Sequence, residues 1–266
     1  MDRIQELVLY GTDKRQSALR SLFEKAGIPT HTPEGYFPAD IRCCDERESD
    51  ITILLPVPCS EDVLESLFER IASGATVIGG RLPAWFVHKC KLQKIHVYDY
   101  MTSSSVAIHN AVATAEGAIC EAISTSPWNL FQNKCLVMGY GRCGSVLADR
   151  LHRLGAVVYV SARDPQKRAC AEVMGHKIYR PATDLSDCYF VFNTIPAPVL
   201  DASILSGLPK STVIIDIASA PGGCDFAYCK EHGIQAALYP ALPAKYAPKS
   251  SAQIIFNHLN EIFEIG

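Results

Sequence analysis

The sequence lacks long hydrophobic runs and has no large excess of charge of either sign. None of its apolar runs approaches the roughly 20 residues needed to cross a membrane, and its formal net charge is only −3. This balance excludes the strongly basic surface with which many proteins bind nucleic acid or anionic lipid. The N-terminus leads directly into a predicted strand and has no signal-peptide pattern. We therefore expect a cytoplasmic protein that binds neither nucleic acid nor a membrane.

The sequence also lacks a C-x-x-C motif, although it contains 11 cysteines. Several cysteines lie in or beside apolar runs, where a reduced thiol acts as a small hydrophobic side chain. The cysteines and histidines show no spacing typical of metal ligands, so the sequence predicts no metal site. Cys143 differs from the others because it lies at a predicted helix N-terminus, which stabilises a thiolate. The role of this cysteine is left open.

With 266 residues, the chain is long enough for two modest α/β domains. In the first 105 residues, short apolar runs alternate with segments whose apolar residues recur at helical spacing. Ser60 precedes one of these helical segments and is a typical N-cap residue. Alternating strands and helices predict a parallel sheet. Residues 1–105 are expected to form the smaller, flavodoxin-like domain, with strands at 7–10, 51–55 and 75–78.

A long helix and a second α/β domain follow. Apolar residues at spacings of three and four predict a helix that bridges the domains over residues 106–126. Residues 245–266 are expected to form a helix that packs back on the first domain. Ligands of such proteins bind at the carboxyl ends of the strands, so we expect a site in the cleft between the domains. Residues 127–244 predict a doubly wound, Rossmann-type domain with strands at 135–138, 156–160, 189–192, 213–216 and 236–239.

The most informative motif is the glycine-rich segment that follows the strand at 135–138. The first glycine of such a motif permits a tight turn, the second lets the backbone approach a pyrophosphate, and the third lets helix and strand pack closely. The following helix adds free N–H groups and a partial positive charge at its N-terminus. The motif predicts a dinucleotide site, the alternative being an ordinary glycine-rich turn. Its residues are Gly139, Tyr140, Gly141, Arg142, Cys143 and Gly144.

The end of the next strand indicates which dinucleotide is bound. NAD-binding domains usually place a carboxylate there to bond the ribose 2′-hydroxyl, whereas this chain has Ser161 and Arg163. Arg163 can pair with a 2′-phosphate, Ser161 can donate a hydroxyl, and Arg142 can approach from the glycine-rich turn. Asp164 precedes a proline and is expected to cap the next helix. The pattern favours NADP over NAD, with a solvated Arg163 as the alternative.

Polar residues after the later strands are candidates for the rest of the cofactor site. The segment Asn193, Thr194, Ile195 and Pro196 is expected to line the nicotinamide-ribose side of the cleft, or to form only a proline-stabilised turn. Asp216 ends a buried strand and can act as a general base or as a hydrogen-bond anchor, although such a residue often caps a turn.

Candidates for substrate binding and proton transfer lie on three further segments. Lys249 precedes the last helix and can hold a substrate carboxylate or take part in catalysis. Glu116 on the bridging helix can act as an acid or a base. For both residues, a solvated surface position is the alternative. Asn110 and Thr114 on the bridging helix, and Ser219 after Asp216, complete the candidate substrate contacts.

Together these motifs resemble the A subunits of dipicolinate synthase from endospore-forming bacteria. The resemblance is strongest over residues 106–260, whereas the N-terminal third is similar mainly in its layout. Its most specific part is the run Ala-Ser-x-Pro-Gly-Gly-x-Asp-Phe at 218–226, combined with Ala-Pro-Lys at 247–249. The other matching segments are 54–57, 106–110, 114–117, 137–142, 193–196 and 216–217.

The resemblance implies NADP-dependent oxidation of a dihydrodipicolinate-type precursor, a small dicarboxylate, to dipicolinic acid. It also implies a partner, which is a flavoprotein-like B subunit, and a place in the mother cell of a sporulating bacterium; homo-oligomerisation is left open. A 2-hydroxy-acid dehydrogenase is disfavoured, because such enzymes rely on an arginine near the nicotinamide and no arginine follows Arg180 in this chain. A shikimate- or folate-type NADP dehydrogenase, and a non-catalytic nucleotide-binding subunit that regulates its partner, remain as alternatives.

Overall fold

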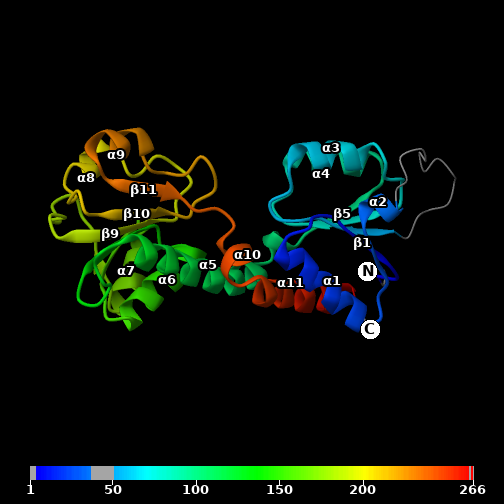
Figure 1. The fold of residues 1–266 in the computed structure, drawn as a ribbon, viewed down its shortest axis with the longest axis horizontal. Coiled ribbons are helices and arrows are strands. Elements are labelled where there is room, and N and C mark those ends of the chain that lie inside the picture. Colours follow the sequence, from blue (N-terminus) through cyan, green and yellow to red (C-terminus); the bar gives the residue numbers. More distant parts are fainter. Residues whose placement is uncertain (1–3, 37–50, 264, 266) are drawn as a thin grey trace. The chain divides into compact units, whose positions relative to one another are not determined.

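The computed structural model describes residues 4–36, 51–263 and 265, and the chain divides into two compact units (Figure 1). The first unit comprises residues 1–109 and 247–266, and the second comprises residues 110–246. The long helix α5 (Ser104–Thr125) contributes residues to both units.

Within the described residues, the first unit contains a parallel sheet of five strands in the order β2-β1-β3-β4-β5. This order is that of flavodoxin-like folds, as the sequence predicts. The strands are β1 (Leu7–Leu9), β2 (Thr30–His31), β3 (Thr52–Leu54), β4 (Thr76–Gly79) and β5 (His96–Asp99). The helices are α1 (Lys14–Lys25), α2 (Pro33–Tyr36), α3 (Glu61–Phe68), α4 (Ala84–Leu92), the 3₁₀ helix η1 (Tyr100–Thr102) and α11 (Pro248–Phe263).

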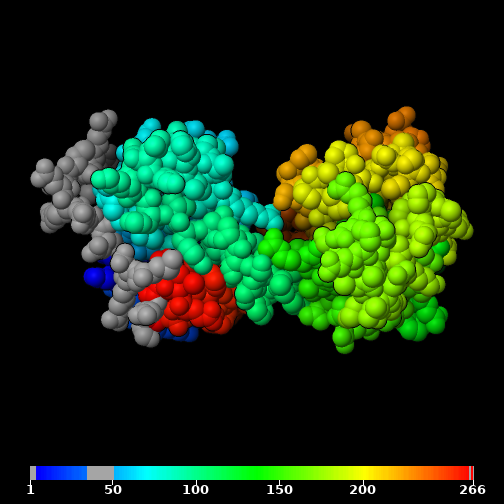
Figure 2. Space-filling view, turned by 180° about the vertical axis from the view of Figure 1, so that it is seen from behind, coloured from blue at the N-terminus to red at the C-terminus, as the bar shows by residue number. Residues whose placement is uncertain are grey.

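Different helices cover the two faces of this sheet, because successive side chains of a strand point to opposite faces. Leu7 and Leu9 of β1 pack with α1 and α11, whereas Val8 packs with α3 and α4. The helix α11 lies beside α1 (Figure 1), and the rings of Phe23 and Phe256 meet edge to face with centroids 5.1 Å apart. Figure 2 shows α11, in red, on the surface of this unit. Apolar burial therefore joins the C-terminal helix to the first unit.

Two details of the first unit differ from the sequence-based expectation. The apolar pattern predicts neither β2 nor β5, because within the described residues each pairs with one neighbouring strand and its residues are exposed or half-buried. Ser60 stands at the N-cap of α3, but its side chain makes no capping hydrogen bond. The expected N-cap position of Ser60 is therefore confirmed, although its hydroxyl does not cap the helix.

Within the described residues, the second unit contains a parallel sheet of six strands in the order β11-β10-β9-β6-β7-β8. The strands are β6 (Lys134–Met138), β7 (Val157–Ser161), β8 (Lys177–Ile178), β9 (Cys188–Asn193), β10 (Val213–Asp216) and β11 (Gln235–Leu238). The helices are α6 (Arg142–Arg153), α7 (Pro165–Val173), α8 (Ala202–Leu205), α9 (Phe226–His232) and α10 (Leu242–Tyr246).

Helices cover both faces of the second sheet, which confirms the doubly wound, Rossmann-type architecture. Residues of α5, α6 and α7 pack on one face in a single hydrophobic cluster, and residues of α8 and α9 pack on the other. A parallel sheet buried on both faces is expected to have nearly continuous apolar strands, as in β9 and β10. The strand order reverses between β6 and β9, which is where ligands of such folds bind.

Hydrogen bonds to a buried carboxylate hold the short helix α10 against α5. Glu121 of α5 is 7% exposed and accepts hydrogen bonds from Lys245 Nζ at 2.5 Å and Tyr246 Oη at 2.7 Å. Burial raises the pKa of Glu121, but the hydrogen bonds from Lys245 and Tyr246 outweigh it and hold the pKa below its usual value. Gly117 allows this approach, since a Cβ there would lie 2.9 Å from the Tyr246 ring.

The Glu121 network predicts a pH-dependent contribution to stability. Because the folded-state pKa is lowered, the contribution is complete above the unfolded-state value of about 4.5 and is lost as the pH falls through the folded-state pKa. Glu121→Gln should lower the thermal unfolding midpoint by roughly 2–4 °C at pH 7, and this difference should shrink below about pH 4.5. Unfolding midpoints from pH 3 to 7 test this. Glu172→Gln removes an exposed carboxylate of α7 as a control, and a constant difference would contradict the assignment.

No helix in the described ranges is both long enough and apolar enough to span a membrane. Among the same residues, no group of three or more histidine, cysteine, aspartate or glutamate side chains is placed to hold a metal ion.

Candidate functional site

The three glycines of the motif after β6 occupy three different environments. Gly139 has a φ of +97°, which favours glycine, and a Cβ there would lie 2.5 Å from Thr194 Oγ1. A Cβ on Gly144 would lie 2.2 Å from the Gly139 carbonyl oxygen, so α6 can start this close to β6 only with glycine. A Cβ on Gly141 would meet no atom within 4 Å. The turn is therefore tight at its two ends and open in the middle.

The open middle of the turn lies at the N-terminus of α6. Gly141 is the N-cap residue, and no side chain caps the helix there. A helix start with open space beside it and no capping side chain suits an anion, because the first N–H groups and the helix dipole both favour negative charge. Tyr140 and Cys143 of the motif are half-buried and Arg142 is exposed. Burial raises the pKa of Tyr140, with smaller effects from Cys170 and Asp149.

Strand register brings the ends of three strands together around this turn. Met138 of β6 pairs with Ser161 of β7 on one side and with Asn193 of β9 on the other. Gly139 donates its N–H to the Ser161 carbonyl at 2.8 Å. Thr194 donates both its N–H, at 3.0 Å, and its hydroxyl, at 2.9 Å, to the Met138 carbonyl. The segments after β6, β7 and β9 thus lie together at the carboxyl end of the sheet.

The loop after β7 is held by an arginine that the sequence analysis does not single out. Arg168 Nη1 donates to the carbonyls of Ala162, at 3.1 Å, and Arg163, at 2.7 Å. The side chain of Arg163 is left exposed and Ser161 is half-buried. Asp164 caps α7 by accepting from Gln166 N at 2.9 Å, which confirms that expectation. The signal in the sequence that could have identified Arg168 is its position, because a basic residue one turn into the helix can reach back to the preceding loop.

Asp216 lies at the end of β10 and is fully buried. Its carboxylate accepts hydrogen bonds from Asn193 Nδ2 at 3.0 Å, Ala218 N at 3.0 Å and Gly223 N at 2.8 Å. Asn193 is also fully buried and exchanges two further hydrogen bonds with the backbone of Ile195. This geometry is that of a hydrogen-bond anchor between the loops after β9 and β10. Proton transfer by Asp216 stays a prediction.

Glycines make the approach of these two loops possible. A Cβ on Gly222, whose φ is +89°, would lie 2.7 Å from Asp216 Oδ2. A Cβ on Gly223 would lie 2.3 Å from the Ala197 carbonyl oxygen. Beyond them, Cys224 and Cys229 place their Sγ atoms 3.6 Å apart, in the positions that flank a helix start and often pack together. Burial raises the pKa of both thiols, which suits a packing role.

The remaining predicted residues lie on α5, α11 and the loop after β10. Glu116 is exposed, and its Oε1 lies 3.7 Å from Arg150 Nε. Thr114 donates its hydroxyl to the Asn110 carbonyl at 3.1 Å. The exposed residues Ser219 and Lys249 lie after β10 and in the first turn of α11, and Lys249 belongs to the first unit. The structure thus brings the cofactor candidates of the second unit together at one sheet edge.

The fold and these strand ends define a class of structure: two α/β units, each built on a parallel sheet, one of which carries a glycine-rich turn between a strand and a helix. A family described as putative NAD(P)-binding matches residues 127–229, which include the glycine-rich turn and the ends of β9 and β10. The transhydrogenase of Sinorhizobium meliloti has the same fold, with a TM-score of 0.68 over 97% of this chain and 92% of that one, at 16% identity. The second unit therefore contains an NAD(P)-binding domain.

Two further comparisons identify the family. The chain is 30% identical over 231 residues to the A subunit of dipicolinate synthase from Bacillus subtilis strain 168, a match that covers 79% of this chain and 77% of that protein. The crystal structure of the A subunit of dipicolinate synthase from Bacillus halodurans is similar with a TM-score of 0.82 at 26% identity, over 99% of both chains. The chain therefore belongs to the family of dipicolinate synthase A subunits, as its motifs indicate.

Proposed function

We propose that this protein oxidises a dihydrodipicolinate-type precursor to dipicolinic acid with NADP⁺, acting with a B subunit in the cytoplasm of a sporulating mother cell. Membership of the family supports the reaction, and the name of the Bacillus subtilis relative, which is that of one lettered subunit, supports the existence of a partner. The observation that carries the proposal is the glycine-rich turn, open at Gly141 beside a helix N-terminus, within the NAD(P)-binding match.

The reaction balances with one dinucleotide. Bound NADP⁺ supplies a hydride acceptor, and the ring of the precursor loses that hydride and one proton to become aromatic. Gly141 and the first turn of α6 would hold the pyrophosphate, and Ser161, Arg163 and Arg142 the 2′-phosphate. The segment Asn193–Pro196 would face the nicotinamide side. Asn110, Thr114, Ser219 and Lys249 are the proposed contacts of the substrate carboxylates. Glu116 and Lys249 are the proposed acids or bases, and Asp216 is proposed to anchor the loops after β9 and β10, with proton transfer as the alternative role.

The preference for NADP over NAD depends on Arg163 in this proposal. Arg163→Ala should weaken NADP⁺ binding by at least about tenfold, because a charge-assisted contact with the 2′-phosphate is lost, and should change NAD⁺ binding less than about threefold. Calorimetric titration with both dinucleotides measures this. Lys167→Ala removes an exposed positive charge of α7 four residues away as the matched control. Equal weakening of both dinucleotides would overturn the assignment.

The activity is tested by following dipicolinate formation from freshly generated dihydrodipicolinate, with NADP⁺ or NAD⁺, and with or without the B subunit. NADP⁺-dependent product from this chain alone would make it the catalytic dehydrogenase. Product only with the B subunit would make the active site shared. NADP binding without product in either case would favour another substrate, as in a shikimate- or folate-type dehydrogenase, or a regulatory nucleotide-binding subunit.

A further inference from the structure

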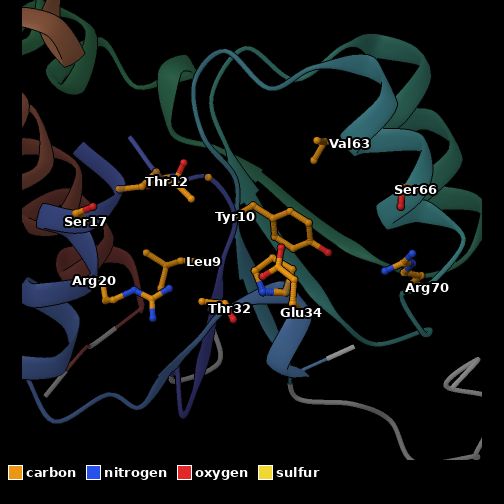
Figure 3. A pocket seen from close by; sticks show the side chains of 13 residues that line it. Leu9, Tyr10, Thr12, Ser17, Arg20, Thr32, Glu34, Val63, Ser66 and Arg70 are labelled. Atoms are coloured by element: carbon orange, nitrogen blue, oxygen red, sulfur yellow. The ribbon is translucent and has the colours of Figure 1, made fainter. Parts of the chain in front are cut away.

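The first unit contains a cavity of about 520 Å³ at the carboxyl end of β1 (Figure 3). Its lining comes from the segment after β1, the first turns of α1, the start of α2 and one side of α3. None of the residues proposed above for NADP or for the precursor lines it. The cavity is therefore a feature of the first unit that the proposed function does not use.

The position of the cavity follows from the strand order. The chain leaves β1 through α1, which packs on one face of the sheet, and leaves β3 through α3, which packs on the other. Since β1 and β3 are neighbours, their connections diverge at the carboxyl ends of the strands. Such a reversal of strand order opens a crevice, and in open α/β sheets this crevice is where ligands bind.

The charged lining of the cavity favours an anion. Arg20 of α1 and Arg70 after α3 both line it, and Figure 3 shows them on opposite sides of the Tyr10 ring. Among the described residues, neither arginine has a hydrogen bond or an ion pair in this structure. Glu34 supplies one opposing charge beside Tyr10. Within the described lining, two guanidinium groups against one carboxylate leave a positive balance, and guanidinium matches carboxylate and phosphate oxygens in geometry.

Two neutral polar groups add hydrogen-bonding capacity. Burial raises the pKa of Tyr10 to about 12, with Arg70 opposing and Glu34 reinforcing the effect, so its phenol stays protonated at neutral pH. Gln16 lines the cavity, is 2% exposed, and its buried amide oxygen has no hydrogen-bond partner within the described residues. A buried polar atom without a partner is rare in native proteins. This oxygen is itself buried, so Gln16 contributes to the cavity as a polar residue of its lining.

We propose that this cavity binds a small organic anion, a carboxylate or a phosphate ester, between Arg20 and Arg70, with Tyr10 and Gln16 as hydrogen-bonding partners. The strand reversal provides the crevice, the two arginines provide the charge, and the Tyr10 hydroxyl and the Gln16 side chain provide polar groups in the lining.

The test is calorimetric titration of the 266-residue chain with three probes: inorganic phosphate, succinate and dipicolinate. At least one should bind the wild-type protein, and Arg20→Gln and Arg70→Gln should each weaken that binding by at least about tenfold. Glu34→Gln should act in the opposite direction and strengthen it about two- to threefold, because it removes the opposing charge. An unfolded variant cannot produce this gain. Lys91→Gln, on α4 outside the cavity, is the control for loss of one positive charge and should leave the affinity within twofold.

Failure of all three probes to bind at millimolar concentration would overturn the proposal, as would binding that neither Arg20→Gln nor Arg70→Gln weakens. NADP⁺ titration of the same variants keeps the two proposals distinguishable. Variants that no longer bind the anion but still bind NADP⁺ support an anion site in the cavity, whatever reaction the second unit catalyses. Variants that bind neither ligand overturn the assignment of the anion site to the first unit.

Discussion

Gly141→Ala should abolish most dinucleotide binding and leave the protein folded, whereas Gly144→Ala should lower both the dinucleotide affinity and the stability of the protein. A methyl group on Gly141 meets no protein atom within 4 Å, and the φ of this residue is −93°, which alanine adopts without strain. The unfolding midpoint should therefore stay within about 2 °C of wild type. The same methyl group occupies the space through which the backbone approaches a pyrophosphate. NADP⁺ affinity should fall by well over tenfold.

Gly144→Ala is the matched comparison within the same turn. Its Cβ would lie 2.2 Å from the Gly139 carbonyl oxygen, a backbone atom that cannot move without displacing β6 from α6. Overpacking of this kind destabilises by roughly 1–3 kcal/mol or more, so both the unfolding midpoint and the NADP⁺ affinity should fall. Thermal unfolding and calorimetric titration of the two variants measure the difference. Unchanged NADP⁺ affinity in Gly141→Ala would remove the turn from the cofactor site, however stable the variant is.

The glycine-rich turn could be predicted from the sequence because its requirements are local. A strand, three glycines at fixed spacing and a helix follow one another within 20 residues. Gly139 and Gly144 each lie against a neighbour in the chain or after the adjacent strand, whereas Gly141 has open space beside it. The buried strands β6, β9 and β10 were equally predictable, since continuous apolar runs bounded by turn residues have few alternatives. The strand β10 has the predicted bounds of 213–216.

Contacts between residues distant in the chain could not be predicted in this way. Asn193 bonds Asp216 across 23 positions, and Glu121 bonds Lys245 across 124. Nothing in the local pattern around Glu121 distinguishes it from Glu116, yet one is buried in a hydrogen-bond network and the other is exposed. The cavity beside Tyr10 likewise depends on four segments that meet only in the folded unit. Burial and partner choice at such positions are properties of the tertiary structure.

Asp216→Asn should destabilise the protein and lower its activity through the loops that Asp216 holds, rather than through loss of a base. The substitution replaces one carboxylate oxygen with an N–H₂ group, which would face a backbone N–H or Asn193 Nδ2 and leave a buried donor unpaired. Hydrogen bonds to a charged group contribute roughly 1.5–3 kcal/mol each, and an orphaned buried donor is of similar weight. We expect a loss of about 2–4 kcal/mol in the free energy of unfolding.

The kinetics of Asp216→Asn separate the anchor from a catalytic base. Displaced loops should weaken NADP⁺ binding and lower kcat together, with an unchanged pH profile for the activity that remains. Asp225→Asn is the matched control: Asp225 caps α9 by accepting from Tyr228 N at 2.9 Å, and asparagine caps a helix nearly as well. A stable Asp216→Asn variant that keeps its NADP⁺ affinity but loses a hundredfold or more in kcat, along with the basic limb of the pH profile, would instead make Asp216 the proton acceptor.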